Sequence, residues 1–172
     1  MIHAKFLPAL LLLAGCATTD NTGPAGSAGA ELREPGGRLV ARAALSQMDG
    51  GVHVRVDASG LAPGHYGAHI HMTGRCDPPG FDSAGGHWNP TARQHGRLNP
   101  QGRHLGDLPN LDVGPDGTGR LDYHVAGASL RSGANAILDG DGAAMVIHVG
   151  PDDYRTDPSG NSGARMACGV LR

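Results

Sequence analysis

Alternating apolar and polar residues are the clearest pattern in the chain. Residues 52–59 place valine or alanine at every second position with polar residues between them, which predicts a β-strand with one buried face. The same alternation, or a short apolar run, predicts further strands at 38–46, 68–72, 121–125 and 143–149. Turn sequences rich in Gly and Asp separate several of them, at 49–51, 60–64 and 139–142.

Two long stretches, residues 73–106 and 150–164, have no apolar period and are rich in Gly, Pro, Asp and Asn. Loops of this length within a compact domain are usually functional or disordered. Short strands separated by turns, together with these two stretches, predict an all-β domain, an antiparallel sandwich or barrel with two long loops.

Composition agrees with this fold class. Glycine (29) and proline (12) make up about a quarter of the 172 residues, yet 39% of residues are hydrophobic, enough for a packed core. One lysine and two glutamates leave few of the residues that usually cover exposed helices, so bundles and coiled coils are disfavoured. The net charge of −2 argues against a nucleic acid partner, because binding to phosphates requires a basic excess.

The first residues have the pattern of a targeting signal. Lys5 precedes an apolar run at 6–14 that is too short to span a bilayer and fits a secretory signal. The run ends in Leu13-Ala14-Gly15-Cys16, which resembles the lipobox of bacterial lipoproteins and implies cleavage before Cys16 and lipidation of that cysteine. An ordinary signal peptide with an incidental cysteine is the alternative.

These features predict the domain organisation: a lipoprotein signal peptide at 1–15, a lipidated cysteine and flexible tether at 16–30, and one folded domain at 31–172. The tether is expected because residues 17–30 are small, polar and glycine-rich. By the lipobox resemblance, Ala17 after the cysteine favours the outer membrane. The expected location is the bacterial cell envelope, lipid-anchored and facing the periplasm.

Cys76 and Cys168 remain if Cys16 carries lipid. An even pair in an oxidising compartment predicts one disulfide. In the chain-entropy model a crosslink over so long a loop stabilises by about 3–5 kcal/mol. A thiolate metal site is the alternative, although no CxxC pair or adjacent histidine supports it.

Ten histidines are present, against five Phe and Tyr together. His69 and His71 lie two apart on a predicted strand, so their imidazoles share one face, a common half of a metal site. His148 lies on the last predicted strand. The first long loop region adds four candidates at intervals of eight, nine and three residues, namely His87, His95, His104 and Asp107. Imidazoles suit copper and zinc, and a carboxylate suits zinc.

These residues and their neighbours resemble the copper/zinc superoxide dismutases, especially the bacterial envelope forms. The resemblance covers roughly residues 39–171. It rests on Gly67-Ala68-His69-Ile70-His71, Gly74-Arg75-Cys76, Gly85-Gly86-His87-Trp88-Asn89-Pro90, His95-Gly96, His104-Leu105-Gly106-Asp107-Leu108, Ile147-His148, Asp152-Asp153 and the segment from Gly160 to Val170. It implies an immunoglobulin-like Greek-key β-barrel or sandwich of about eight antiparallel strands.

The resemblance also implies one copper and one zinc per chain. The copper ligands would be His69, His71, His87 and His148. The zinc ligands would be His87, His95, His104 and Asp107. The expected reaction is conversion of superoxide to oxygen and hydrogen peroxide, an antioxidant defence of the envelope. Copper would alternate between two oxidation states, and zinc would be structural.

Further roles follow from matching positions. His87 would bridge both metals and carry a proton to the product. Arg165 would attract the superoxide anion, although a structural role as a donor to nearby carbonyls is the alternative. Asp152 would link His69 to His95. Cys76 and Cys168 match the family's disulfide.

Three further histidines of the domain are not expected to bind metal, and three other functions are less compatible with the sequence. His53, His65 and His124 are expected to be surface residues. A copper-buffering lipoprotein would keep the ligands without needing Arg165, and an inert β domain would be expected to lose ligands. A zinc-only hydrolase is disfavoured because three histidines and an aspartate leave zinc no open position.

The chain departs from the family at two positions before the first copper ligand. Tyr66 and Ala68 stand where histidine and phenylalanine are common, so packing beneath that strand is in question. Met72 stands where an acidic residue is common. A homodimer is compatible with the resemblance, but the short segment from Cys76 to His87 gives no basis for carrying over known dimer contacts.

Overall fold

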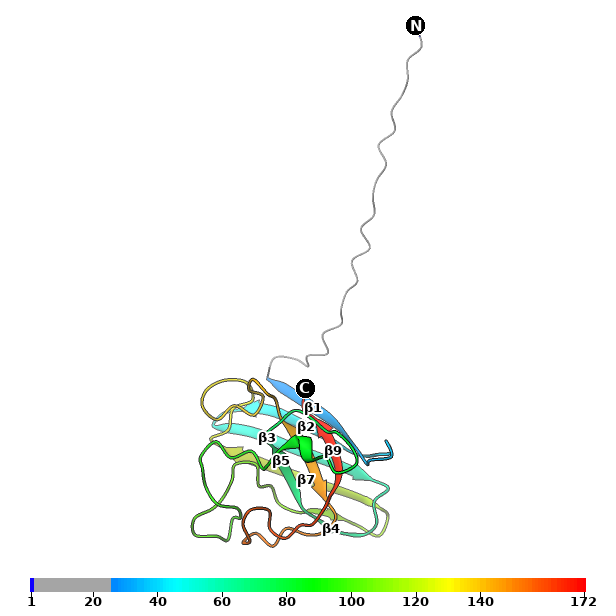
Figure 1. Cartoon of the computed structure of the whole chain (residues 1–172), viewed down its shortest axis with the longest axis vertical. Coiled ribbons are helices and arrows are strands. Elements are labelled where there is room, and N and C mark those ends of the chain that lie inside the picture. The colour runs from blue at the N-terminus through cyan, green and yellow to red at the C-terminus, as the bar shows by residue number, and fades with distance from the viewer. Residues whose placement is uncertain (2–25) are drawn as a thin grey trace.

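A computed structural model describes Met1 and residues 26–172 of the chain, and these form a nearly closed antiparallel β-barrel (Figure 1). The strands are β1 (Ser27–Arg33), β2 (Leu39–Met48), β3 (Gly51–Ser59), β4 (Gly64–Tyr66), β5 (Ala68–His71), β6 (Leu111–Val113), β7 (Thr118–Ala126), β8 (Ala144–His148) and β9 (Arg165–Val170). Their order in the sheet is β4-β6-β7-β3-β2-β1-β9-β8-β5. The edge strands β4 and β5 are separated in sequence by Gly67 alone, so the sheet curls until its edges meet.

The predicted alternation is confirmed in β3. Val52, Val54 and Val56 are fully buried, and the polar residues between them face outward. The turn Asp49-Gly50 joins β2 to β3, and Gly50 has a φ of 75°, a left-handed conformation that glycine adopts without strain. The all-β prediction is therefore confirmed, with nine strands in the described residues rather than about eight.

The predicted boundary between tether and domain is wrong. Residues 27–30, which we assigned to the tether, belong to β1 and pair with β2, from Ser27 opposite Ser46 to Ala30 opposite Ala43. Their small side chains carry almost no apolar signal, and only the pairing with β2 shows that they are part of the sheet. The predicted signal peptide and Cys16 lie outside the described residues. Within the described part of the chain, no helix is long and apolar enough to cross a membrane.

Packing beneath β5 is intact despite the two departures from the family pattern. Tyr66 is buried, and its hydroxyl donates a hydrogen bond to the Ala62 carbonyl at 2.8 Å. Ala68 and Ile70 are fully buried in the same core. The phenol of Tyr66 thus satisfies its polar end locally while its ring joins the apolar interior.

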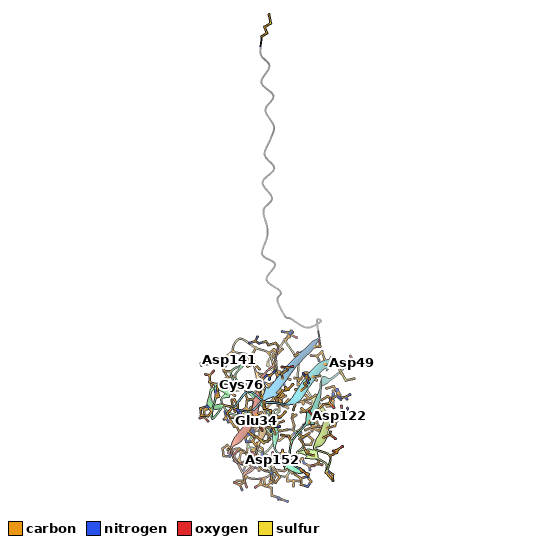
Figure 2. All side chains as sticks on the ribbon, turned by 90° about the vertical axis from the view of Figure 1, so that its right-hand side faces the viewer. Glu34, Asp49, Cys76, Asp122, Asp141 and Asp152 are labelled. Carbon is orange, nitrogen blue, oxygen red and sulfur yellow. A yellow bond between two sulfur atoms is a disulfide. The ribbon has the colours of Figure 1, made fainter. Side chains whose placement is uncertain are left out.

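Two loops leave the barrel at β5 and β8. The first loop (residues 72–110) contains one short 3-10 helix, Asp82–Ala84, and the second loop is residues 149–164. Cys76 of the first loop lies on the opposite side of the molecule from Asp49 and Asp122 (Figure 2). Both loops are close to the stretches predicted from their lack of apolar period.

Backbone hydrogen bonds fasten two distant parts of the first loop to β5. The Ile70 N–H donates to Gly106 O at 2.9 Å, the Trp88 N–H to Ile70 O at 2.8 Å, and the Gly106 N–H to Trp88 O at 2.9 Å. A Cβ atom at Gly106 would lie only 2.4 Å from Ile70 O. This close approach, which glycine alone permits, brings the histidine-bearing parts of the loop against β5.

We predict that Gly106→Ala lowers the free energy of unfolding by about 1–3 kcal/mol, because the added methyl group collides with rigid backbone atoms. Gly140→Ala is the matched control, since a Cβ there meets nothing within 4 Å. Urea unfolding monitored by circular dichroism would measure both. Equal stability of the two variants would contradict the close packing of Gly106 against Ile70 O.

Candidate metal centre

Six histidines and two aspartates are buried where β5, β8 and the two loops meet. His69 and His71 come from β5, and His148 ends β8. The first loop supplies His87, His95, His104 and Asp107, and the second supplies Asp152. None of these residues is more than 8% exposed. Sequence spacing alone had singled out all of the histidines and Asp107, and the structure brings them together.

The first group is made of imidazoles only. One ring nitrogen from each of four histidines lies within 4.8 Å of the others, from His69, His71, His87 and His148. These nitrogens, Nδ1 of His69 and Nε2 of the other three, are buried and have no hydrogen-bond partner among residues 26–172. An unpartnered buried polar atom costs about 1–3 kcal/mol. Four at one point fit a shared metal ion, and imidazole nitrogen is a donor that copper accepts readily.

The outer ring nitrogens fix the tautomers of this group. The Nδ1–H of His71 donates to Gly85 O at 2.9 Å, and the Nδ1–H of His148 donates to Gly163 O at 2.9 Å. The Nε2–H of His69 donates to a carboxylate oxygen of Asp152 at 2.8 Å. Each hydrogen bond places the ring proton on the outer nitrogen, which leaves the inner nitrogen with a lone pair free for a metal ion.

The second group combines three imidazoles with a carboxylate. The Nδ1 atoms of His87, His95 and His104 lie 2.9, 3.0 and 3.1 Å from Asp107 Oδ1. The His95 contact is short but lacks hydrogen-bond geometry. The other oxygen, Asp107 Oδ2, accepts the backbone N–H groups of Gly96 at 2.9 Å and His104 at 3.1 Å. Three nitrogens and one oxygen are a donor set that suits tetrahedral zinc.

His87 belongs to both groups. Its Nε2 faces the first group, and its Nδ1 faces the second. The ring centroids of His87 and His69 are 3.9 Å apart. A single imidazole therefore separates the two candidate metal positions.

Asp152 links the two groups from outside. Its Oδ2 accepts from His69 Nε2 at 2.8 Å, and its Oδ1 accepts from His95 Nε2 at 2.9 Å. Asn110 fixes the backbone of Asp152 with two hydrogen bonds. The Asn110 Nδ2–H donates to Asp152 O at 3.0 Å, and Asn110 Oδ1 accepts the Asp152 N–H at 2.8 Å. The Tyr154 N–H also donates to Asp152 Oδ1, at 2.6 Å. Sequence reasoning found Asp152 by resemblance but missed Asn110 and Tyr154, which belong to no recognisable spacing.

Burial and hydrogen bonding set the charges. Burial lowers the pKa of His69 to about 3 and that of His148 to about 4, and it holds the pKa of His71 well below 6.5. Burial alone would raise the pKa of Asp107, but its contacts with His104, His87 and His95 and the hydrogen bond from the Gly96 N–H outweigh burial and hold this pKa far below the usual range. Burial is likewise outweighed at His95, whose pKa rises to about 9 through the carboxylates of Asp107 and Asp152.

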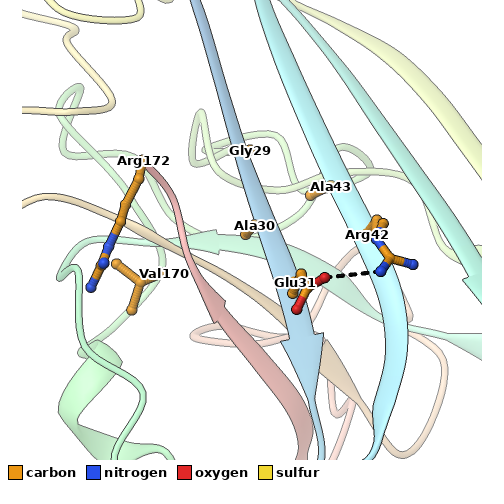
Figure 3. A pocket seen from close by; sticks show the side chains of 7 residues that line it. All are labelled: Gly29, Ala30, Glu31, Arg42, Ala43, Val170 and Arg172. Carbon is orange, nitrogen blue, oxygen red and sulfur yellow. Dashed lines mark hydrogen bonds and ion pairs between the residues drawn. The ribbon is translucent and has the colours of Figure 1, made fainter. Parts of the chain in front are cut away.

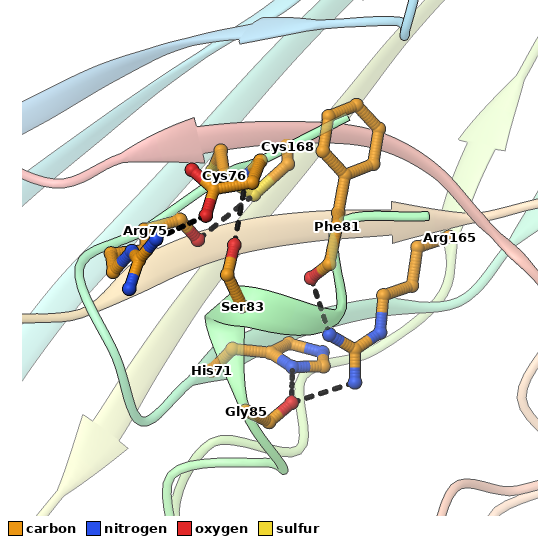
Figure 4. The surroundings of a disulfide bond; sticks show 9 residues. His71, Arg75, Cys76, Phe81, Ser83, Gly85, Arg165 and Cys168 are labelled. Carbon is orange, nitrogen blue, oxygen red and sulfur yellow. Dashed lines mark hydrogen bonds and ion pairs between the residues drawn. A yellow bond between two sulfur atoms is a disulfide. The ribbon is translucent and has the colours of Figure 1, made fainter. Parts of the chain in front are cut away.

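Arg165 is held beside the first group (Figure 4). Its guanidinium donates to Phe81 O and to Gly85 O, both at 2.6 Å. Gly85 O also accepts the His71 Nδ1–H, so one carbonyl joins the arginine to a ligand of the first group. Burial lowers the pKa of Arg165 below its ordinary value.

The predicted disulfide is confirmed. Cys76 of the first loop and Cys168 of β9 are bonded; they are 92 positions apart in sequence, and their Cα atoms are 5.7 Å apart. The thiolate metal site considered for these two cysteines is therefore wrong. The bond joins the first loop, whose carbonyls accept hydrogen bonds from Arg165, to β9, which contains Arg165 (Figure 4).

A cavity of about 400 Å³ opens onto the first group. Its lining includes His71, His87, His148 and Arg165. A larger hollow, about 560 Å³, lies over the outer surface of β1, β2 and β9, where Glu31 and Arg42 form an ion pair at 2.9 Å (Figure 3). That hollow has no histidine in its lining, so the smaller cavity is the candidate path for a substrate to the metal centre.

The three remaining histidines of the described domain lie outside the centre, as predicted. His65 and His124 are exposed, and His53 is partly exposed. His65 contacts Asp112 at 2.6 Å and His53 contacts Asp122 at 3.1 Å, both on the outside of the barrel.

Comparison with known proteins agrees with this geometry. A family model described as copper/zinc superoxide dismutase (SODC) matches residues 40–171. A protein of Aquifex aeolicus named superoxide dismutase [Cu-Zn] 1 is 43% identical over 145 residues, which covers 83% of this chain and 86% of that protein. A Caulobacter vibrioides protein named superoxide dismutase [Cu-Zn] is 38% identical over 149 residues, covering 85% and 86%.

Solved structures give the same result. A SOD-like protein from Bacillus subtilis superposes with a TM-score of 0.80 at 42% identity, covering 84% of this chain and 97% of that one. The Cu/Zn superoxide dismutase of Brucella abortus superposes with a TM-score of 0.65 at 32% identity, covering 85% and 99%. Sequence, fold and buried donor sets agree, and the chain belongs to the copper/zinc superoxide dismutase family.

Proposed function

We propose that the protein is a superoxide dismutase that converts two superoxide anions and two protons into O₂ and H₂O₂. Copper would be held by His69, His71, His87 and His148. Zinc would be held by His87, His95, His104 and Asp107. The observation that carries this proposal is the sharing of His87 between an all-imidazole set and a set of three imidazoles and one carboxylate.

The two donor sets suit different tasks. Copper supplies, when bound, a one-electron step in either direction, and zinc has no redox step of its own. Three of the four imidazoles of the first group, His71, His87 and His148, line the cavity, where an anion can reach them. The set containing Asp107 is closed by four protein donors, which suits a structural ion.

His87 is the residue that can move a proton. Its Nδ1 lies 2.9 Å from Asp107 Oδ1, while its Nε2 has no hydrogen-bond partner among the described residues and belongs to the group that borders the cavity. A proton taken up at Nε2 can be returned to the departing peroxide. The Asp107 carboxylate keeps the ring in place and raises the basicity of the imidazole.

Arg165 is the residue that can bind the substrate anion. It lines the same cavity as His71 and His148, and two backbone carbonyls hold its guanidinium in a fixed position. The N–H groups not used by these carbonyls can donate to superoxide. A fixed positive charge at the end of a cavity also attracts small anions and raises their association rate.

We predict that the metal-loaded protein starting at Gly26 is active and that Arg165→Gln lowers its kcat/KM for superoxide about 10-fold or more. The matched control is Arg75→Gln, because Arg75 is an exposed arginine of the first loop that pairs with Asp77 outside the cavity. Pulse radiolysis at several salt concentrations measures both variants. The rate of the control should stay near the wild-type rate, with the wild-type dependence on salt.

Wild-type protein that binds one copper and one zinc per chain without dismutase activity would contradict the proposal and favour copper buffering. An Arg165→Gln variant as fast as wild type would remove the role given to Arg165.

The metal-free protein should lose stability as the pH falls from about 6.5 to 4.5. Burial lowers the folded-state pKa values of His69, His71, His87 and His148 from 6.5, so in this window the unfolded chain binds more of their protons than the folded chain does. Each contributes up to about 1.4 kcal/mol per pH unit. His95, whose folded-state pKa is about 9, is protonated in the folded protein throughout this window. The unfolded chain is also protonated there below about pH 5.5, so His95 opposes the slope only near pH 6.5.

Urea unfolding of the metal-free protein across this pH range measures the slope. His148→Gln should reduce the slope by about one quarter to one third, because one of the four histidines whose pKa burial lowers is removed. A midpoint independent of pH would contradict this account, because it would show that these histidines bind protons equally in the folded and unfolded protein.

We further propose that the protein is anchored to the bacterial envelope by a lipid on Cys16 and acts there against superoxide. The support is the apolar run at 6–14 followed by Leu13-Ala14-Gly15-Cys16, with a small, glycine-rich segment after it. The disulfide between Cys76 and Cys168 agrees with an oxidising compartment.

We expect the full chain, expressed in a bacterial host, to be recovered with the membranes and Cys16→Ser to be recovered in the soluble fraction. Mass spectrometry of the wild type should find acyl groups on the peptide that begins at Cys16. Recovery of unacylated wild-type protein in the soluble fraction would rule out the anchor.

A further inference from the structure

The outer ring nitrogens of the ligand histidines have well-defined partners, with one exception. His69 and His95 donate to Asp152, His71 donates to Gly85 O, and His148 donates to Gly163 O. His87 has no outer nitrogen, because both of its ring nitrogens face a metal position. For His104, whose Nδ1 faces Asp107, no hydrogen bond from Nε2 is formed within the described residues.

The acidic group nearest to that nitrogen is Asp157 of the second loop. Its Oδ1 lies 4.0 Å from His104 Nε2. The same Oδ1 accepts the backbone N–H of His95 at 2.6 Å. One carboxylate oxygen of the second loop therefore contacts or approaches both histidines that serve the Asp107 group alone.

We propose that Asp157 is a positioning residue for the zinc site and that its carboxylate accepts the Nε2–H of His104 when zinc is bound. The distance of 4.0 Å can be closed by a small shift of the side chain or bridged by one water, since Asp157 is 48% exposed. Partners of this kind orient the imidazole, fix its tautomer and increase its basicity toward the metal.

The consequence is a second link from the second loop to the candidate centre. Asp152 reaches His69 and His95, whereas Asp157 reaches His95 and His104. The second loop would thus hold two zinc ligands of the first loop, His95 and His104. The inference rests on the proposed zinc site and adds one residue to it.

The test measures the zinc dissociation constant of copper-free protein by competition with a chromogenic chelator. Asp157→Ala removes both contacts and should weaken zinc binding about 10-fold or more. Asp157→Asn keeps an oxygen acceptor for the His95 N–H but removes the charge, and should weaken zinc binding about 3-fold, since a neutral hydrogen bond is about half as strong as a charged one.

Asp153→Asn is the matched control. It removes the same charge from the same loop, and Asp153 bonds to Arg155, Thr156 and Asn161 rather than to a ligand histidine. This control should bind zinc as the wild type does. Copper affinity should be unchanged in all three variants.

NMR of the zinc-loaded protein gives a readout that loop anchoring alone would not change. The Nε2–H of His104 should be visible and protected from exchange in wild type and Asp153→Asn, and exchange-broadened in Asp157→Ala. The proposal is overturned if both Asp157 variants bind zinc like wild type, or if Asp153→Asn weakens zinc binding as much as Asp157→Asn. Wild-type protein that binds no zinc would instead contradict the proposed zinc site itself.

Discussion

The burial of six imidazoles around two points is the constraint on which the rest of the structure depends. Four buried ring nitrogens of the first group have no hydrogen-bond partner in the described part of the chain, and folding a chain around them is costly unless cations fill the space they enclose. Burial keeps His69, His71 and His148 neutral, as metal ligands must be, and the charges of Asp107 and Asp152 offset part of the positive charge that metals would bring. Metal binding and folding are therefore coupled in this protein.

The barrel supplies the fixed reference for this centre. β5 places His69 and His71, and backbone hydrogen bonds among Ile70, Trp88 and Gly106 dock the first loop onto it. The Cys76–Cys168 bond then fastens the same loop to β9, and Asp152 joins the second loop to both groups. Two glycine-rich loops without an apolar core of their own are thus held by hydrogen bonds, one disulfide and a shared set of ligands.

Much of this arrangement could be predicted from sequence because its signals are local. The alternation in β3 and the intervals from His87 to Asp107 are visible in short windows. β1 was missed because its Gly and Ala residues carry no apolar period, and its place depends on pairing with β2. Asn110 and Asp157 were missed because their partners lie 42 and 62 residues away, and no spacing rule connects them.

The central claim is that one imidazole, His87, joins a copper site to a zinc site. The most direct test is anomalous X-ray diffraction at the copper and zinc absorption edges, on crystals of the metal-loaded protein. We predict copper among His69, His71, His87 and His148, and zinc among His87, His95, His104 and Asp107, with one ion on each side of the His87 ring. A single metal position, or two ions without His87 between them, would contradict the account.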